Sequence, residues 1–466
     1  MRDKPNLLFV FTDQHRHDVL GCAGHPLVAT PTLDKLASEG ARFTRAWCQS
    51  PVCMPSRASL ITGRYTEDLG IFSNTHAFDP NWPTVMKTLQ SVGYETATVG
   101  KTHYFPTPNR EEVEVADGPY DLTQRTDFVS DLGWDYVLEE YGKYTHTYPW
   151  LCSPYTEYLN EEGLLEAYRE QIKGVYRLTP DHWRAETSRL PQEHDLTSYI
   201  AARSMDWLRE RSRDQPFFLK LAFVQPHVPL IDDPIWADYY RDADIELPEQ
   251  TPADAPNDVW GEYLKSLNRH SQVQTMTDEF VRSGIRHYLG MVSLIDQKIG
   301  EVMALLDAQG ELENTWIVYS SDHGEMLGEH HLWAKLNFYG GSVQVPLIIR
   351  PPGGTKGRLI DDLVELTDVT ATLADIGGAE PPQGCRGRSL LPALAGQGVD
   401  REFIRSRISG FSAVRNAQYR FTLAVESGTP CELFDLQSDP GEMHNLVNDA
   451  AHADTAETFA EIAAMP

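Results

Sequence analysis

Short apolar runs alternate with helical patterns along most of the chain, and this alternation constrains the fold more than any other feature. The runs typical of buried strands cover residues 7–11, 96–99, 217–223, 316–319 and 346–349. Helical patterns lie between them, at residues 31–38, 82–91 and 277–306. Strands that alternate with helices predict a mostly parallel sheet that is covered by helices on both faces. The predicted fold class is therefore α/β.

Two long insertions interrupt the alternation, at about residues 104–191 and 232–276. After residue 377 the pattern changes to Gly- and Pro-rich turns followed by strand-like pieces such as residues 419–425. We therefore expect a main domain over residues 1–377 and a smaller α+β subdomain over residues 378–466. Insertions of this length are functional loops, lids or oligomer contacts, or else ordinary surface elaboration with some buried aromatic side chains.

Charge and cysteine usage limit the classes of partner and the compartment. The 466 residues hold 68 acidic and 40 basic side chains, a net charge of −28, which argues against nucleic acid or an anionic membrane surface as a partner. No apolar run is long enough to span a membrane. The six cysteines are scattered without a CxxC pair, which suits a reducing compartment. We expect a cytoplasmic protein.

Polar side chains follow four of the predicted strands at the point where each strand ends. Ligands of α/β proteins bind beyond the carboxyl ends of parallel strands, so these side chains are candidates for one site. The residues concerned are Asp13 and Gln14, Lys101 and His103, His227, and Asp322 and His323.

Two carboxylates, an imidazole and an amide oxygen in this set form a candidate metal site. Asp13, Gln14, Asp322 and His323 could hold one divalent cation. Ligation rich in oxygen indicates Ca²⁺, Mg²⁺ or Mn²⁺, and the nitrogen ligand favours Mn²⁺. The alternative is that an aspartate after a strand only caps the next helix.

Cys53 is a candidate nucleophile. Pro55 predicts a helix that begins near Cys53, where free backbone N–H groups and the helix dipole stabilise an anion. Arg57 lies four residues further on the same helix face and could approach the side chain at position 53. The alternative is an inert cysteine at a helix start.

These motifs together resemble the formylglycine-dependent sulfatases of the alkaline phosphatase superfamily. The match covers nearly the whole chain except the long insertions. It is most specific at Cys53-x-Pro55-Ser56-Arg57, and it includes Gly100-Lys101-x-His103, Pro226-His227-x-Pro229, residues 321–325, Lys335 and residues 432–442. The resemblance implies an alkaline-phosphatase-like α/β domain with a small C-terminal subdomain.

The resemblance also implies a mechanism. In this family a separate formylglycine-generating enzyme oxidises the cysteine to formylglycine, which hydrates to a geminal diol. One hydroxyl of residue 53 would attack sulfur and expel the alcohol, and the second would release sulfate from the covalent intermediate. The predicted function is hydrolysis of an aryl or small alkyl sulfate monoester.

Besides residue 53, the resemblance assigns roles to nine residues of this sequence. Asp13, Gln14, Asp322 and His323 would hold the metal. Lys101 and Lys335 would bind the sulfate oxygens, and Arg57 would orient the diol. His103 would assist breakdown of the intermediate, and His227 would protonate the leaving group.

Gln14 and His323 depart from the commonest sulfatase pattern, which has an aspartate and often an asparagine at these positions. The pair resembles a cytosolic subgroup that includes choline sulfatases and phosphonate monoester hydrolases. The metal is therefore expected to be Mn²⁺ or Ca²⁺. The alternative functions are hydrolysis of a phosphonate monoester or phosphodiester with the same residues, or binding of sulfated ligands without catalysis.

Two further expectations concern partners. The tyrosine-rich first insertion is a candidate aromatic or cation-binding wall, which would suit aryl or choline-like groups. The insertions and the resemblance predict a homo-oligomer that acts on a small sulfated substrate.

Overall fold

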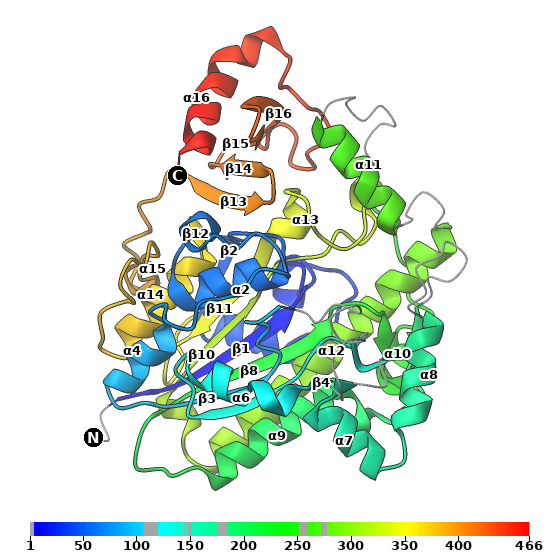
Figure 1. Ribbon diagram of the computed structural model, residues 1–466, viewed down its shortest axis with the longest axis vertical. Helices are drawn as coiled ribbons and strands as arrows, with labels where there is room; N and C mark the ends of the chain where they lie inside the picture. Colours follow the sequence, from blue (N-terminus) through cyan, green and yellow to red (C-terminus); the bar gives the residue numbers. More distant parts are fainter. Residues whose placement is uncertain are drawn as a thin grey trace.

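The computed structural model describes residues 4–106, 120–143, 145–147, 151–175, 185–250, 259–271 and 277–465. Its centre is an eight-stranded sheet (Figure 1). The strands, in sheet order, are β12 (Arg358–Glu365), β2 (Ala41–Trp47), β11 (Gln344–Arg350), β10 (Thr315–Ser321), β1 (Asn6–Asp13), β8 (Phe217–Pro226), β3 (Glu95–Gly100) and β5 (Tyr136–Glu139).

The strands in the middle of this sheet run parallel to one another, and both faces of the sheet are covered there. β1 pairs in parallel with β10 on one side and with β8 on the other, and β3 continues the parallel set. Every residue of β1 and β8 is buried, as expected for strands that carry helices on both faces. The prediction of an α/β protein with a mostly parallel sheet is confirmed.

Helices cover both faces of the sheet. α2, α4 and α14 pack together on one face, and α1, α9 and α12 pack on the other. The helices are α1 (Pro31–Ser38), α2 (Cys53–Thr62), α3 (Thr66–Leu69), α4 (Val85–Ser91), α6 (Thr126–Ser130), α7 (Pro154–Glu161), α8 (Leu165–Val175), α9 (Leu196–Glu210), α10 (Pro234–Tyr239), α11 (Val259–Ser271), α12 (Asp278–Ala308), α13 (Gly340–Val343), α14 (Leu366–Ile376), α15 (Leu391–Leu394) and α16 (Ala453–Ala464). Within the described segments, no helix is both long enough and apolar enough to cross a membrane.

The strand predicted at residues 346–349 is present, but its direction differs from the expectation. β11 is antiparallel to both β10 and β2. The chain between β10 and β11 stays at the carboxyl end of β10 in short turns and a four-residue helix, so no crossover helix returns it to the other end of the sheet. The run belongs to the sheet but not to its parallel part.

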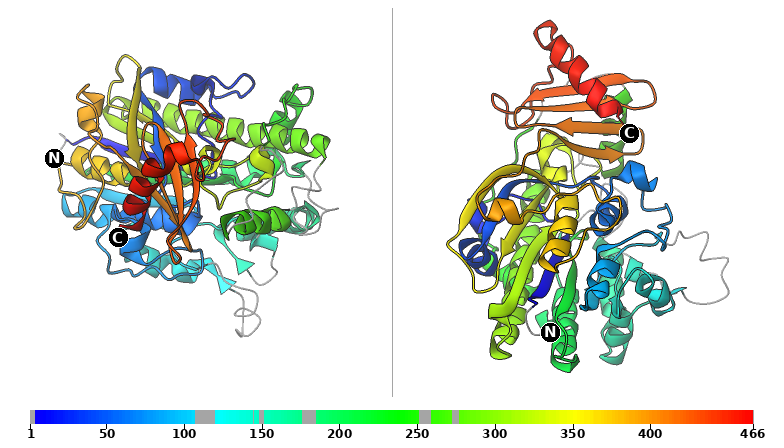
Figure 2. Two further views of the ribbon diagram at one scale, coloured as in Figure 1. Left: turned by 90° about the horizontal axis from the view of Figure 1, so that it is seen from above. Right: turned by 90° about the vertical axis from the view of Figure 1, so that its left-hand side faces the viewer.

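A second, smaller sheet lies at one end of the molecule, with α16 against it (Figure 2). Its four antiparallel strands are β13 (Ile404–Ile408), β14 (Phe411–Arg415), β15 (Tyr419–Ala424) and β16 (Thr429–Asp435). Among the described residues, two further sheets have two strands each: β4 (Tyr120–Asp121) with β6 (Leu151–Cys152), and β7 (Glu186–Thr187) with β9 (Ile231–Asp232). The expected C-terminal α+β subdomain is therefore present.

A buried ion-pair network joins the small sheet to the main domain. Arg420 contacts Glu432 at 2.7 Å and Glu442 at 2.5 Å. Glu432 accepts a hydrogen bond from the Tyr339 hydroxyl at 3.0 Å, and Glu442 accepts one from the Gly340 amide at 2.8 Å. The C-terminal subdomain therefore anchors the segment that follows Lys335.

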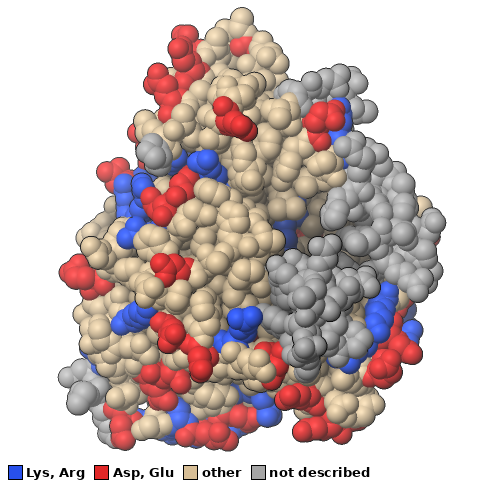
Figure 3. All heavy atoms as spheres, viewed as in Figure 1, with Lys and Arg blue, Asp and Glu red and all other residues tan. Residues whose placement is uncertain are grey.

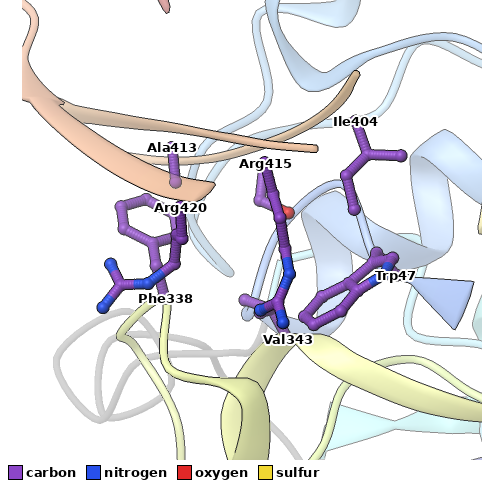
Figure 4. A pocket seen from close by; sticks show the side chains of 8 residues that line it. Trp47, Phe338, Val343, Ile404, Ala413, Arg415 and Arg420 are labelled. Atoms are coloured by element: carbon purple, nitrogen blue, oxygen red, sulfur yellow. The ribbon is translucent and has the colours of Figure 1, made fainter. Parts of the chain in front are cut away.

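A small cavity lies beside this network (Figure 4). In it the guanidinium group of Arg415 lies 3.8 Å from the centre of the Trp47 ring, whereas that of Arg420 points the other way. The cavity is lined by Trp47, Phe338, Val343, Ile404, Ser406, Ala413, Arg415 and Arg420.

Candidate active site

Four neighbouring strands of the main sheet deliver polar side chains to one place. β10, β1, β8 and β3 are consecutive in the sheet and parallel, so their carboxyl ends meet at the same edge. Asp13 is the last residue of β1, and Lys101, His227 and Asp322 directly follow β3, β8 and β10. The helix α2 brings the side chains of Cys53 and Arg57 to the same edge, because it begins at Cys53.

The structure brings all ten predicted site residues together. Nine of them are buried, and Lys335 is partly exposed. Hydrogen bonds or ion pairs connect the residues to one another, namely Asp13, Gln14, Cys53, Arg57, Lys101, His103, His227, Asp322, His323 and Lys335.

The spacing of four side chains fits a metal ion. Ligand atoms of Asp13, Cys53, Asp322 and His323 all lie within 4.8 Å of one another. His323 Nε2 is 3.6 Å from Asp13 Oδ1 and 3.5 Å from Asp322 Oδ1, too far for good hydrogen bonds. Two atoms that ligate one cation at about 2.1–2.4 Å lie roughly 3–4 Å apart, so these distances match a shared ion.

The orientation of the His323 ring also fits ligation. Its Nδ1 lies 3.0 Å from the Gly324 carbonyl oxygen, which can only accept a hydrogen bond. Nδ1 therefore carries a proton, which leaves Nε2 as the ring atom that can ligate a cation.

Gln14 lies beside this cluster in a strained backbone conformation. Its φ angle is 73°, in the region that favours glycine. Its backbone N–H donates to Asp322 Oδ1 at 3.1 Å, and its side-chain Oε1 accepts from Lys335 Nζ at 2.7 Å. The amide oxygen thus faces the centre of the site.

Two cationic side chains contact the two aspartates. Arg57 contacts Asp322 Oδ2 at 2.7 Å and Asp13 Oδ2 at 3.4 Å, and Lys101 contacts Asp13 Oδ2. Burial alone would raise the pKa of Asp13, but Lys101, His227 and Arg57 hold that pKa below its usual range. With a divalent cation added, positive charge exceeds negative charge, so the site suits an anion.

Cys53 lies at the focus of this positive charge. Its Sγ is 3.2 Å from Lys335 Nζ, 3.2 Å from His323 Nε2 and 3.7 Å from Asp13 Oδ1. Burial opposes ionisation, yet Lys335, Lys101 and His323 bring the pKa of the Cys53 thiol well below 9.0. The environment therefore favours an anionic atom at this position.

Two histidines approach Cys53 as well, and both hydrogen-bond it. Burial and Lys101 lower the pKa of His103 to about 4, and burial and Lys335 lower the pKa of His227. His227 Nδ1 lies 2.7 Å from the Val228 carbonyl oxygen, so Nδ1 donates there and Nε2 is the atom that can exchange a proton in the site.

Sequence reasoning missed two buried carboxylates that support the site. Glu139, the last residue of β5, accepts hydrogen bonds from the backbone N–H groups of Thr102 at 3.0 Å and His103 at 3.4 Å. Glu325 accepts from the Gln14 amide and from two backbone N–H groups. Only Glu325 had a sequence signal, its place in the 322–325 motif, whereas nothing in the sequence places Glu139 beside His103.

Glu139→Gln is expected to gain stability relative to the parent as pH rises from 5 to 8. Burial raises the pKa of Glu139 from 4.5 to about 7, so between these values ionisation costs the folded state free energy. The shift corresponds to about 3 kcal/mol, and glutamine avoids it while its oxygen still accepts both hydrogen bonds. Urea unfolding of both proteins at several pH values measures the difference, and a difference independent of pH would contradict this role.

The tyrosines of the first insertion divide into two groups. Tyr155 and Tyr158 of α7 pack against Tyr199, with ring centroids 5.3 and 5.0 Å apart, which is core packing. The ring of Tyr141 lies 5.8 Å from that of His103, beside the site. Tyr144, Tyr148 and Trp150 lie outside the described residues, as do parts of the predicted wall.

Comparison with known proteins identifies the class. The family model described as "Sulfatase" matches residues 5–379, and one described as "N-sulphoglucosamine sulphohydrolase, C-terminal" matches residues 328–464. The first match covers more than half of the chain. This chain belongs to the sulfatase family, whose members are sulfuric ester hydrolases.

Similarity to individual proteins supports this family assignment. The chain is 28% identical to an arylsulfatase of Clostridium perfringens, over 96% of this chain and 90% of that protein. It is 29% identical to a choline-sulfatase of Rhizobium meliloti, over 95% of this chain and 82% of that protein. Its fold is similar to that of the phosphonate monoester hydrolase SpPMH of Silicibacter pomeroyi, with a TM-score of 0.81, 25% identity and coverage of 98% and 94%. The expected resemblance to this group is confirmed.

Proposed function

We propose that the chain hydrolyses a sulfate monoester, either an aryl sulfate or a small alkyl sulfate, to an alcohol and sulfate. The observation that carries the proposal is the position of Cys53. It lies at a helix N-terminus, between Lys335 and the cluster of Asp13 and His323. An anion bound there would meet cationic groups on several sides.

Residue 53 would act after oxidation by the formylglycine-generating enzyme. Conversion of the Cys53 thiol to an aldehyde that hydrates to a diol supplies an oxygen nucleophile at the place that Sγ occupies. The close approach of Lys335 to Sγ supports this role, because an ammonium group stabilises charge on that oxygen.

The metal would be held by Asp13, Gln14, Asp322 and His323. A divalent cation there supplies Lewis-acid stabilisation of the sulfate oxygens and lowers the pKa of the attacking hydroxyl. The neutral ligands Gln14 and His323 leave the set with two carboxylates, and the imidazole nitrogen favours Mn²⁺ over Ca²⁺.

The remaining side chains would bind the sulfate group and move protons. Lys101 and Lys335 bind non-bridging oxygens, since both ammonium groups lie against the metal ligands. Arg57 is held by Asp322 and by the Lys101 carbonyl at 2.6 Å, so it can orient residue 53 rigidly. His103 takes a proton from residue 53. His227 would act in its protonated form, in which Nδ1 keeps its hydrogen bond and Nε2 gives its proton to the departing oxygen.

His227→Ala is expected to impair poor substrates more than good ones. Sulfates with acidic phenol leaving groups need little protonation, whereas alkyl sulfates should lose about 100-fold or more in kcat/KM. Rates across a series of aryl and alkyl sulfates measure this dependence as a steeper slope against leaving-group pKa. An equal loss for every substrate would contradict the assignment.

The substrate is expected to be small. Acidic side chains are spread over the face in Figure 3 and interspersed with basic ones, and the whole chain carries −28. Long sulfated polymers would meet this acidic surface, whereas small monosulfated or cationic-tailed esters need only enter the site. High activity on heparin-like chains would overturn this proposal.

The second candidate function is hydrolysis of a phosphonate monoester or phosphodiester. The fold similarity to SpPMH favours it, as does the Gln14 and His323 pair in the ligand set. Ser56 in the cysteine motif favours sulfate. Steady-state rates on 4-nitrophenyl sulfate and on a 4-nitrophenyl phosphonate monoester show directly which substrate class is preferred. A higher kcat/KM on the sulfate supports the main proposal, and a higher value on the phosphonate replaces it with the second.

A further inference from the structure

We propose that Glu325 is a positioning residue that fixes the side-chain amide of Gln14 and the loop of Lys335 in one arrangement. The inference rests on the proposed function in one respect, namely that Gln14 ligates the metal and Lys335 binds the substrate anion. The interactions of Glu325 themselves are features of the structure.

The Glu325 carboxylate is fully buried and uses both oxygens. Oε2 accepts a hydrogen bond from Gln14 Nε2. Oε1 accepts from the backbone N–H of Leu327 at 3.1 Å and from that of Ala334. One carboxylate therefore connects the residue after β1 to two points in the segment between β10 and β11.

The contact with Gln14 determines which atom of the amide faces the metal pocket. A carboxamide presents an oxygen on one side and an N–H donor group on the other, and only the oxygen can ligate a cation. An ionised carboxylate accepts hydrogen bonds but cannot donate them. Glu325 therefore holds Gln14 Nε2 toward itself, and Oε1 is left facing Lys335 Nζ at 2.7 Å.

The contact with Ala334 holds the segment that carries Lys335. Ala334 and Leu336, on either side of Lys335, have φ angles of 66° and 76°. Non-glycine residues are strained in this region, so the conformation needs support. Two hydrogen bonds provide this support. The Ala334 amide donates to the Glu325 carboxylate, and the Met326 amide donates to the Ala334 carbonyl oxygen at 2.8 Å.

This arrangement predicts the effect of Glu325→Gln. The oxygen of the new glutamine side chain can still accept hydrogen bonds from the backbone N–H groups of Leu327 and Ala334. In that orientation the NH₂ group of the new glutamine faces Gln14. Two NH₂ groups cannot face each other, so the Gln14 amide would rotate and present N–H to the metal pocket and to the Lys335 ammonium group. The variant should therefore bind metal more weakly even though its size and fold are kept.

The reciprocal exchange should restore binding. In Gln14→Glu alone, two carboxylates meet in a buried place, which is unfavourable. In Gln14→Glu combined with Glu325→Gln, the new glutamine donates to one oxygen of the new glutamate, and the other oxygen faces the metal. The effects of the two substitutions on metal affinity should therefore be strongly non-additive.

The test is titration of the metal-free protein with Mn²⁺ alone, measured by calorimetry, with thermal melting as the check on folding. We expect Glu325→Gln to weaken Mn²⁺ binding by about 10- to 100-fold. The double variant should bind more tightly than Gln14→Glu alone. The matched control is Glu329→Gln in the same loop, whose carboxylate pairs with Arg16 instead and should leave Mn²⁺ affinity unchanged.

The outcomes separate this inference from the proposed function, because metal binding requires neither turnover nor the modified residue 53. Weaker binding in Glu325→Gln, with rescue in the double variant, supports the inference even if no sulfate ester is hydrolysed. Unchanged Mn²⁺ affinity in Glu325→Gln, or additive effects in the double variant, would overturn it. A parent protein that binds neither Mn²⁺ nor Ca²⁺ would overturn both proposals.

Discussion

Cys53→Ala is expected to lower kcat/KM for an aryl sulfate by at least about 1,000-fold, which corresponds to about 4 kcal/mol of transition-state stabilisation. The reason is that alanine cannot be converted to formylglycine, so the site loses its nucleophile while the metal ligands and the cations around it remain. Steady-state kinetics on 4-nitrophenyl sulfate measures the loss. Metal content should change little, because four other ligands are kept.

Cys48→Ala is the matched control for this variant. Cys48 is also fully buried and lies only five residues before Cys53, but it precedes α2 and is not one of the residues that cluster around the metal pocket. The control should retain activity close to that of the parent. Comparable activity in Cys53→Ala and Cys48→Ala would show that residue 53 is not the nucleophile.

Asp322→Asn is expected to lower both metal content and activity. The change removes a charged ligand from the cluster with Asp13 and His323, and it weakens the 2.7 Å ion pair that holds Arg57. Loss of the cation removes its stabilisation of the sulfate oxygens, so kcat/KM should fall about 1,000-fold or more. Elemental analysis of the purified variant and kinetics in added Mn²⁺ measure the two effects.

The matched control here is Asp296→Asn. Asp296 is likewise buried, but it accepts hydrogen bonds from the backbone N–H groups of Thr32 and Leu33 at the start of α1, on the other face of the sheet. Each of these hydrogen bonds uses a different oxygen, so asparagine can keep only one of them. Neither bond involves the metal pocket, so metal content and activity should persist. Full metal content in Asp322→Asn would contradict the ligand assignment.

The central strands were predictable from sequence, and the edges of the sheet were not. β1, β8 and β10 are continuous apolar runs because both of their faces are covered. β2 has alternating burial, and β12 is an edge strand with two exposed residues at its start, so neither shows a continuous apolar run. The direction of β11 depends on its connection to β10, which residue composition does not specify.

Some residues of the candidate site were likewise predictable from the sequence, and others were not. Asp13, Lys101, His227 and Asp322 were predictable because each stands at the end of a recognisable strand. Lys335 lies in an irregular loop between two residues with positive φ, so only the resemblance indicated it. Contacts made across loops, such as those of Glu325, depend on three-dimensional packing and leave no periodic signal in the sequence.

The proposed conversion of Cys53 to formylglycine can be detected directly by mass spectrometry. Trypsin cleavage after Arg45 and Arg57 releases a peptide, residues 46–57, that contains both Cys48 and Cys53. Cys48 is an internal control, because its thiol should react with an alkylating reagent in every preparation. The protein should be produced together with the formylglycine-generating enzyme, denatured, alkylated and analysed by mass spectrometry. We expect one alkylated cysteine and an aldehyde at position 53. A peptide with two alkylated thiols, from a preparation that hydrolyses sulfate esters, would show that turnover does not depend on formylglycine.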